Sequence, residues 1–183
     1  FDRGYSVILC NTDDDLDKER AYIDVLIAKQ VDGIIFIAAG EHHEHLIELT
    51  KASIPLVLAD RDVVQSMADV VLVNNEQGGY RATRHLLDLG HQRIGCIAGP
   101  SEAPPSADRV RGYERALREA GMPVREGLIE QGDFRYKGGE DAADQLLGRD
   151  PPLSALFACN DLMAIGALRA IRRAGLRVPK DVS

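Results

Sequence analysis

Short apolar runs rich in valine and isoleucine alternate with segments of helical periodicity along the chain. The runs predict strands at 6–10, 33–37, 56–59, 70–73, 93–98, 127–131 and 155–158. The segments between them predict helices near 15–30, 41–51, 77–89, 108–120, 136–147 and 161–174. Strands that alternate with helices are typical of crossover units that join parallel strands. The pattern therefore predicts an α/β fold with mainly parallel sheets flanked by helices.

Two stretches interrupt this alternation and predict joints in the chain. Residues 60–69 separate two predicted strands without a helical pattern, and residues 74–79 are polar and rich in glycine. We take the second stretch as the boundary between an N-terminal lobe, residues 1–75, and a C-terminal lobe, residues 76–183. A ligand crevice between two such lobes would close by a hinge motion.

Composition excludes several classes of function. The net charge of −7 argues against a direct grip on nucleic acid, which needs a basic face. No apolar run is long enough to predict a membrane span. The three cysteines are expected at strand ends and lack C-x-x-C spacing, which fits reduced thiols in a cytoplasm. The nucleophile elbow, the phosphate loop and the dinucleotide fingerprint are all missing from the sequence, so we expect binding rather than catalysis.

Polar side chains follow the predicted strands, and in a parallel sheet they would gather at one edge, where ligands bind. Arg109 is the strongest candidate. It falls on the apolar side of the helix expected over 108–120, in the first turn. A buried guanidinium needs a partner, which a ligand's hydroxyls or carboxylate could provide. The alternative is an internal ion pair with Asp108 or Asp133, or an apolar stem with an exposed head.

Three further positions are candidates for ligand contact. Asp60 ends an apolar strand and could accept hydrogen bonds from sugar hydroxyls, or it could only cap the following turn. Asn160 and Asp161 end a strand and begin a helix. We expect Asp161 to cap or brace that helix and Asn160 to point towards the ligand. Phe134 follows Gly132-Asp133 and could stack on a ligand ring, or it could belong to the core.

The helix expected over 161–174 carries a second apolar face. Leu162 and Ile165 lie opposite the predicted sheet-facing stripe, on the same side as Arg169. Apolar side chains among arginines favour a partner surface, which we interpret as a homodimer interface. The alternative is a pair of scattered exposed apolar residues, which is common.

A cluster of histidines raises the question of a metal site. His42 and His45 are three residues apart and could share one helix face. Nothing nearby completes a ligand set, and such a polar stretch is usually a solvated helix start. We therefore expect no metal and no cofactor.

Short motifs spaced along the whole chain resemble those of the lactose-repressor/galactose-repressor (LacI/GalR) family of transcriptional regulators. Among them are Val31-Asp32-Gly33-Ile34-Ile35, Asn74-Asn75, Gly99-Pro100, Arg109-x-x-Gly112-Tyr113, Gly132-Asp133-Phe134 and Asn160-Asp161-x-Met163-Ala164-x-Gly166-Ala167. One departure is Ala103-Pro104-Pro105, which replaces polar residues that bind effector in some members. The spaced set is far more specific than any single motif.

The resemblance implies a two-lobed, periplasmic-binding-protein-like type I fold, incomplete at both ends of this chain. It implies a small-molecule effector between the lobes, a sugar more often than a purine, contacted by Arg109, Asn160, Phe134 and Asp60. It also implies a cytoplasmic homodimer that reads operator DNA through a helix-turn-helix headpiece outside this chain. Two alternatives remain: a periplasmic sugar-binding protein of an ABC uptake system, and a doubly wound enzyme whose nucleophile lies elsewhere.

Overall fold

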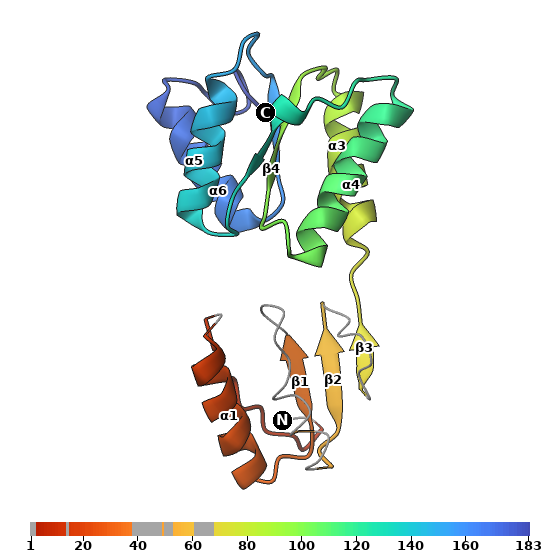
Figure 1. The fold of residues 1–183 in the computed structure, drawn as a ribbon, viewed down its shortest axis with the longest axis vertical. Coiled ribbons are helices and arrows are strands. Elements are labelled where there is room, and N and C mark those ends of the chain that lie inside the picture. The colour runs from red at the N-terminus through yellow and green to blue at the C-terminus, as the bar shows by residue number, and fades with distance from the viewer. Residues whose placement is uncertain (1–2, 14, 38–48, 50–52, 61–67) are drawn as a thin grey trace. The chain divides into compact units, whose positions relative to one another are not determined.

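The computed structural model describes residues 3–13, 15–37, 49, 53–60 and 68–183. These residues form two compact units, residues 1–73 and residues 74–183. Figure 1 shows the elements of each. We describe each unit by itself.

The unit of residues 1–73 contains a three-stranded parallel sheet in the order β1-β2-β3. Its elements are α1 (Leu16–Ala28), β1 (Ile34–Ile37), β2 (Leu56–Ala59) and β3 (Asp69–Val71). Asp15 caps α1, because its carboxylate accepts hydrogen bonds from the backbone N–H groups of residues 17 and 18. The buried side chains that hold this unit together are Ile23, Phe36, Leu49 and Leu58.

The unit of residues 74–183 is the larger and more regular of the two. Its helices are α3 (Asn75–Asp88), α4 (Pro104–Glu119), α5 (Tyr136–Leu147) and α6 (Asp161–Arg173), with a short 3₁₀ helix η1 (Glu126–Leu128). Its strands are β4 (Ile94–Ala98), β5 (Ile129–Gln131) and β6 (Ala155–Ala158). The strands are parallel, in the order β5-β4-β6. The predicted α/β class with parallel sheets is thereby confirmed.

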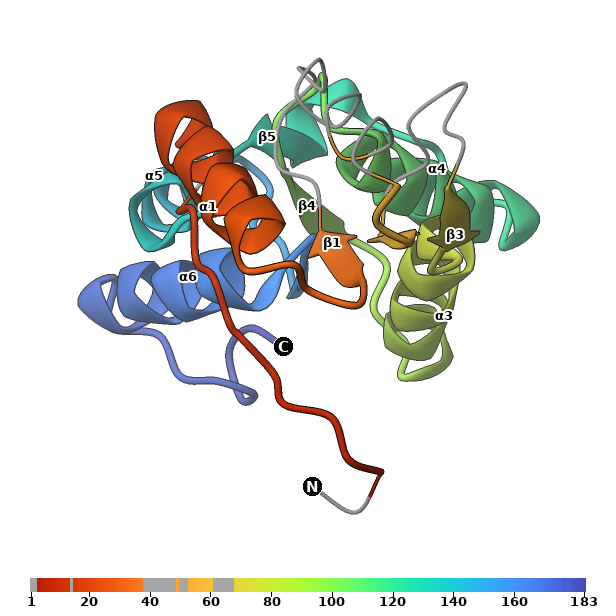
Figure 2. The ribbon, with the colours of Figure 1, turned by 90° about the horizontal axis from the view of Figure 1, so that it is seen from below.

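Helices cover both faces of this second sheet. Figures 1 and 2 show α3 and α4 on one side of β4, with α5 and α6 on the other. Strand β4 is central and its residues 94–97 are buried, as expected for a strand covered on both faces. Every strand of the sheet points the same way, so the segments that leave β4, β5 and β6 share one carboxyl edge.

Glycines let the helices of each pair approach closely. In α3 and α4, an added Cβ on Gly79 would lie 2.1 Å from the carbonyl oxygen of Arg109, and one on Gly112 would lie 2.0 Å from that of Glu76. In α5 and α6, an added Cβ on Gly166 would lie 2.1 Å from the carbonyl oxygen of Tyr136. No side chain fits at these distances. The glycines therefore fix how each pair packs on the sheet.

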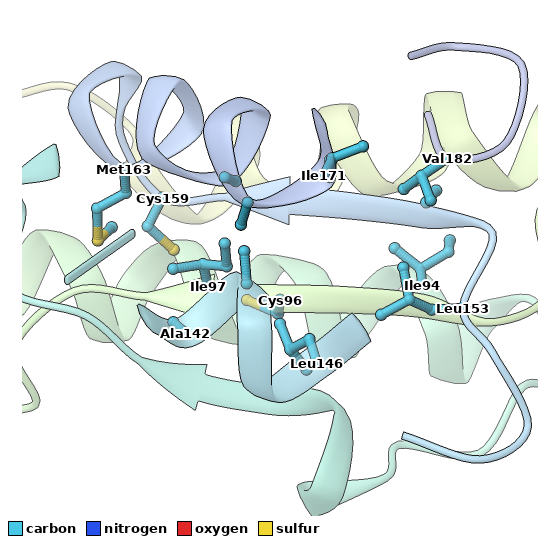
Figure 3. Packing of buried hydrophobic residues seen from close by; sticks show 14 of the residues in the cluster. Ile94, Cys96, Ile97, Ala142, Leu146, Leu153, Cys159, Met163, Ile171 and Val182 are labelled. Carbon is cyan, nitrogen blue, oxygen red and sulfur yellow. The ribbon is translucent and has the colours of Figure 1, made fainter. Parts of the chain in front are cut away.

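The core of this unit runs the length of β4. Figure 3 shows Cys159 and Met163 near one end of the strand, with Ile94, Leu153 and Val182 near the other. Cys96 lies in the middle of β4 and is buried. Its expected position at a strand end is therefore wrong. Cys159 follows β6 directly.

The first predicted strand is not present. Residues 6–10 are described but are not in a strand and pair with none of the described strands, and Val7 and Leu9 are almost fully exposed. The apolar alternation of this segment indicates a pleated surface, but a strand also needs a neighbour with free hydrogen-bonding groups. The sequence pattern carries no information about that neighbour.

Two helices begin earlier than their apolar periodicity predicts. The segment 74–79, expected to be a glycine-rich joint, is the cap and first turns of α3, with Asn74 as the N-cap. Helix α4 begins at Pro104, four residues before the predicted start. Proline is tolerated in a first turn, where the backbone N–H has no partner within the helix. Arg109 consequently lies in the second turn and not the first.

Two predictions from the sequence, a helix and a pair of histidines, fall on residues outside the described ones. The helix expected over 41–51 falls there apart from Leu49, which is helical and buried. His42 and His45 lie there as well. Among the described residues, no helix has both the length and the apolar character that a bilayer crossing requires.

Candidate functional site

The carboxyl edge of the β5-β4-β6 sheet gathers polar groups from three loops. Strand β4 leads through Gly99 into α4, β5 leads into residues 132–135, and β6 leads into the cap of α6. Helices α4 and α6 therefore both begin at this edge. It is the edge at which open parallel sheets bind their ligands.

Arg109 is held at this edge by two neutral acceptors. Its Nε donates to Oδ1 of Asn75 at 2.9 Å, and its Nη1 donates to the carbonyl oxygen of Cys159 at 2.6 Å. Asn75 is the first residue of α3, and Cys159 is the residue that follows β6. The side chain of Arg109 is half-buried. Its guanidinium thus links the start of α3 to the end of β6.

No carboxylate neutralises Arg109 within the described part of the chain. The two acids suggested by the sequence are engaged elsewhere. Asp108 forms an ion pair with Arg111, and Oδ1 of Asp133 accepts from the backbone N–H of Arg135 at 2.8 Å. The positive charge and the Nη2 donors of Arg109 remain without an acceptor among the described residues. A ligand oxygen or anion could accept from these donors.

Asn160 combines two contacts. Its Oδ1 accepts from the backbone N–H of Met163 at 2.9 Å, which makes it the N-cap of α6. Its Nδ2 donates to the carbonyl oxygen of Phe134 at 2.9 Å. The expectation that Asp161 caps the helix is therefore wrong, because the capping residue is the one before it. Both polar atoms of the Asn160 amide already have protein partners, although each can form a further hydrogen bond.

Phe134 adopts an unusual backbone conformation. Its φ is +63°, in the left-handed region, and its backbone carbonyl receives the Asn160 amide. Its ring lies against Gly99, where an added Cβ would be 2.1 Å from Cε1 of the ring. The ring also packs against the core of the unit. The contacts described thus place Phe134 beside Asn160 with one side of its ring against the protein.

Asp60 belongs to the other unit. It follows β2 directly, and its φ is +67°. Its backbone N–H donates to the carbonyl oxygen of Val71 at 2.9 Å. Within its own unit, Asp60 therefore stands at the carboxyl edge of the β1-β2-β3 sheet, directly after the central strand.

Two cysteine thiols lie close to Arg109: Cys96 in β4, and Cys159, whose carbonyl Arg109 binds. A hydrogen bond between Cys96 and Cys159, together with burial, raises the pKa of the Cys96 thiol well above its usual range. The same hydrogen bond lowers the pKa of Cys159, and the Arg109 charge lowers it further. Both cysteines are free. The positive potential of Arg109 thus extends to the side chain of the residue whose carbonyl it binds.

The surface of α6 away from the sheet carries the residues expected at a subunit contact. Leu162 is 39 % exposed and Ile165 is 42 % exposed. The guanidinium carbon of Arg169 lies 5.6 Å from the centre of the Tyr136 ring on α5. We call Tyr136, Leu162, Ile165 and Arg169 the α6 patch. Among the described residues, no group of three or more histidine, cysteine or acidic side chains could hold a metal ion.

Comparison with known proteins places the chain in a family. All of residues 1–183 match the family described as periplasmic binding proteins and sugar binding domain of LacI family. The HTH-type transcriptional regulator DegA of Bacillus subtilis is 39% identical over 183 residues, covering 98% of this chain and 54% of the relative. The chain belongs to the LacI family. The resemblance drawn from its motifs is confirmed.

Solved LacI-family structures agree in fold. The transcription regulator CcpA of Lactococcus lactis superposes with a TM-score of 0.85 at 29% identity, over 99% of this chain and 66% of that one. The transcriptional regulator CelR, solved as a cellobiose complex, gives 0.78 at 36% identity, over 91% of this chain and 52% of that one. This LacI-family chain spans about half the length of the curated relatives it matches. These relatives are transcriptional regulators, which favours that class over the periplasmic and enzyme alternatives.

One residue of the candidate site was missed by the sequence analysis. Asn75 is buried and accepts the hydrogen bond from Nε of Arg109. A signal was present, since two consecutive asparagines precede a helix that needs only one N-cap. Asn74 provides that cap, accepting from the backbone N–H of Gln77 at 2.9 Å. The amide of Asn75 is therefore not needed for that cap, and its Oδ1 accepts from Arg109.

Proposed function

We propose that the chain is the effector-binding and dimerisation domain of a LacI-type transcriptional regulator. A small molecule, a sugar rather than a purine, binds between the two lobes, residues 1–75 and 76–183, and contacts Arg109, Asn160, Phe134 and Asp60. Effector binding changes the operator affinity of a helix-turn-helix headpiece outside this chain. The protein acts as a homodimer in the cytoplasm and is not an enzyme.

The observation that supports this proposal best is the state of Arg109. Its guanidinium is oriented by Asn75 and the Cys159 carbonyl, yet its charge has no carboxylate partner among the described residues. An oriented donor with free N–H groups is suited to a ligand oxygen, and holding it in advance reduces the entropy lost on binding. Neutral acceptors leave its charge available, whereas an ion pair would compete with the ligand.

Calorimetry on variants of Arg109 tests the effector site. A thermal-shift screen of monosaccharides, disaccharides and nucleobases first identifies a ligand, because a bound effector raises the melting temperature. Arg109→Met is then expected to weaken that ligand by roughly 10- to 150-fold, the equivalent of about 1.5–3 kcal/mol for a charged hydrogen bond. Arg111→Met is the matched control, since Arg111 is a neighbour on α4 that pairs with Asp108. Equal affinity of the two variants would contradict the assignment.

Two of the matches support the choice of a sugar over a purine. CelR was solved with cellobiose, and the matched family includes sugar-binding domains. The combination of an arginine, an amide and an aromatic ring suits the hydroxyls and the apolar face of a sugar. A nucleobase as the only thermal-shift hit would overturn this choice while leaving the Arg109 assignment open to the same calorimetric test.

The homodimer part of the proposal depends on the α6 patch. Ile165→Glu places a charge at its centre and is expected to shift the protein to monomers in sedimentation equilibrium. Leu89→Glu is the matched control, because Leu89 is a 62 % exposed leucine at the end of α3, outside the patch. A dimer that survives Ile165→Glu, or is lost equally in Leu89→Glu, would reject Leu162, Ile165 and Arg169 as the interface.

A further inference from the structure

The guanidinium of Arg109 keeps most of its hydrogen-bonding capacity at the carboxyl edge of the β5-β4-β6 sheet. An arginine side chain has five N–H donors. The described contacts of Arg109 use one donor on Nε, to Asn75, and one on Nη1, to the carbonyl oxygen of Cys159. One donor on Nη1 and both donors on Nη2 therefore have no acceptor among the described residues.

The Nη2 atom is also open to a ligand. In the described part of the chain, the guanidinium nitrogens that are both buried and without a partner are Nε of Arg93 and Nε of Arg115. Nη2 of Arg109 is not one of them, although no described residue accepts from it. A ligand oxygen can therefore reach Nη2 without displacing a protein group.

The other arginines of the same helix show what is unusual about Arg109. Helix α4 carries four arginines. Three of them form ion pairs: Arg111 with Asp108, Arg115 with Glu76, and Arg118 with Glu114. The fourth, Arg109, is bound only by an asparagine amide and a backbone carbonyl, both of which are neutral.

This distribution of acids is the reverse of what stability alone requires. Arg111 and Arg118 are exposed, and an exposed ion pair contributes little. Arg109 is half-buried, and a charge that is partly withdrawn from water needs a counter-charge more. The described residues do not supply one to Arg109. The missing negative charge is therefore expected from a ligand.

The field of the uncompensated charge is visible at a neighbouring side chain. A hydrogen bond with Cys96 lowers the pKa of the Cys159 thiol, and the charge of Arg109 lowers it further. An anion at this edge of the sheet would be stabilised by the same field.

We propose that the effector is an acidic sugar, one that carries a carboxylate or a phosphate, and that this anionic group accepts hydrogen bonds from Nη1 and Nη2 of Arg109. The inference rests on the proposed function, to which it adds the charge of the ligand. The hydroxyls of a neutral sugar would satisfy the donors but leave the guanidinium charge uncompensated. An anionic group satisfies the donors and the charge together.

Matched sugars test the charge of the ligand. Calorimetry on the full chain compares D-glucose with D-glucuronate and D-glucose 6-phosphate, and D-galactose with its uronate and 6-phosphate. In the series that binds, an acidic member is expected to bind roughly tenfold more tightly than its neutral parent, and the better acid identifies the group as carboxylate or phosphate.

The possible failures are distinguishable. A neutral sugar that binds as tightly as its acids, or more tightly, would overturn this inference and leave the proposed function standing. If neither these sugars nor any saccharide in the thermal-shift screen binds, the proposed function itself is contradicted, and this inference with it.

Asn75→Asp tests the same point from the side of the protein. Aspartate has nearly the shape of asparagine and accepts the same hydrogen bond from Nε of Arg109, but it adds the counter-charge that the site lacks. The roughly tenfold preference for the acidic sugar over its neutral parent is expected to fall to about one. A general loosening of α3 would weaken both sugars equally and leave this ratio unchanged.

Asn74→Asp is the matched control. It makes the same change one residue earlier, where the side chain accepts from the backbone N–H of Gln77 and not from Arg109. The preference for the acidic sugar should stay within about twofold of its original value. A preference that survives Asn75→Asp, or falls equally in both variants, would show that the anionic group is not bound by Arg109.

Discussion

The helix pairs on the two faces of the β5-β4-β6 sheet both pack closely through glycines, but they place different side chains at the surface. Gly79 and Gly112 bring α3 and α4 together, and Gly139 and Gly166 do the same for α5 and α6. The first pair directs the charged side chain of Arg109 to the sheet edge. The second pair buries the thioether of Met163 and leaves the apolar α6 patch outside.

The difference between the pairs lies in their side chains and not in their backbone packing. One helix of each pair also has an asparagine as its N-cap: Asn74 caps α3, and Asn160 caps α6. Residues that shape the scaffold therefore occur in both pairs, whereas Arg109, which has no carboxylate partner among the described residues, lies on the first pair. Substitutions at matched positions can tell the two kinds apart.

The largest effect is expected from filling the glycine contacts. Gly79→Ala and Gly166→Ala each place a methyl group about 2.1 Å from a backbone oxygen, so a helix must move, at a cost of about 1–3 kcal/mol in the free energy of unfolding. Urea denaturation measures it. Gly78→Ala, one residue away in open space, should instead stabilise α3 by about 0.5–1 kcal/mol. A Gly166→Ala protein as stable as Gly78→Ala would mean that the pairs are not packed alike.

The second effect is on the free energy of unfolding and concerns the hydrogen bond from Arg109 on α4 to Asn75 on α3. Arg109→Met leaves Oδ1 of Asn75 and the Cys159 carbonyl without their donor, at a cost of about 1–3 kcal/mol. A double-mutant cycle with Asn75→Ala should give a coupling energy of about 0.5–3 kcal/mol. The control cycle with Asn74→Ala should give almost none, because that amide caps α3. Equal coupling in both cycles would show a general loosening of α3 and not a specific bond.

Sequence periodicity predicted most of this scaffold. Strands such as β4 and β6 and helices such as α5 and α6 follow from apolar spacing, because a covered sheet and its helices impose that spacing directly. Residues 6–10 were predicted wrongly as a strand, since pairing depends on a neighbour that the local pattern does not encode. The start of α4 was missed because Pro104 and Pro105 carry no amphipathic signal, although both fit a first turn.

The site was predictable only in part, for a related reason. Arg109 could be selected from its place on a helix wheel, and Asn160 and Phe134 from their positions after strands. Their partners could not, because Asn75 is 34 residues from Arg109 in the chain. Which of two adjacent residues caps α6 also depends on backbone geometry, and the cap fell to Asn160 instead of Asp161.

A smaller effect should distinguish the two asparagine caps. Aspartate can replace asparagine as a cap acceptor, and its charge is favourable at a helix N-terminus, so Asn74→Asp should change stability by less than about 0.5 kcal/mol. Asn160→Asp keeps the cap but loses the donor to the Phe134 carbonyl and sets a carboxylate against that oxygen. A loss of about 1–2 kcal/mol is expected, measured by chemical denaturation. If both variants are neutral, the Asn160 amide is only a cap.

The smallest expected effect is on the salt dependence of stability. It distinguishes the outer faces of the two helix pairs, because in each pair an arginine forms an ion pair across the two helices. Arg115 on α4 pairs with Glu76 on α3 and lies 4.2 Å above the Tyr80 ring, whereas Arg173 on α6 pairs with Glu140 and Asp144 on α5. Exposed ion pairs contribute little and are screened by salt, but a cation over a ring keeps about 0.5–1 kcal/mol.

Thermal melts in low salt and in about 1 M NaCl, where the Debye length falls to about 3 Å, therefore discriminate between these two bridges. Arg173→Met should lower the melting temperature slightly in low salt and not at all in high salt. Arg115→Met should retain part of its effect in high salt, because packing on Tyr80 does not depend on screening. An Arg115→Met deficit that disappears completely with salt would show that the ring contact adds nothing, and that the outer faces of the two pairs are equivalent after all.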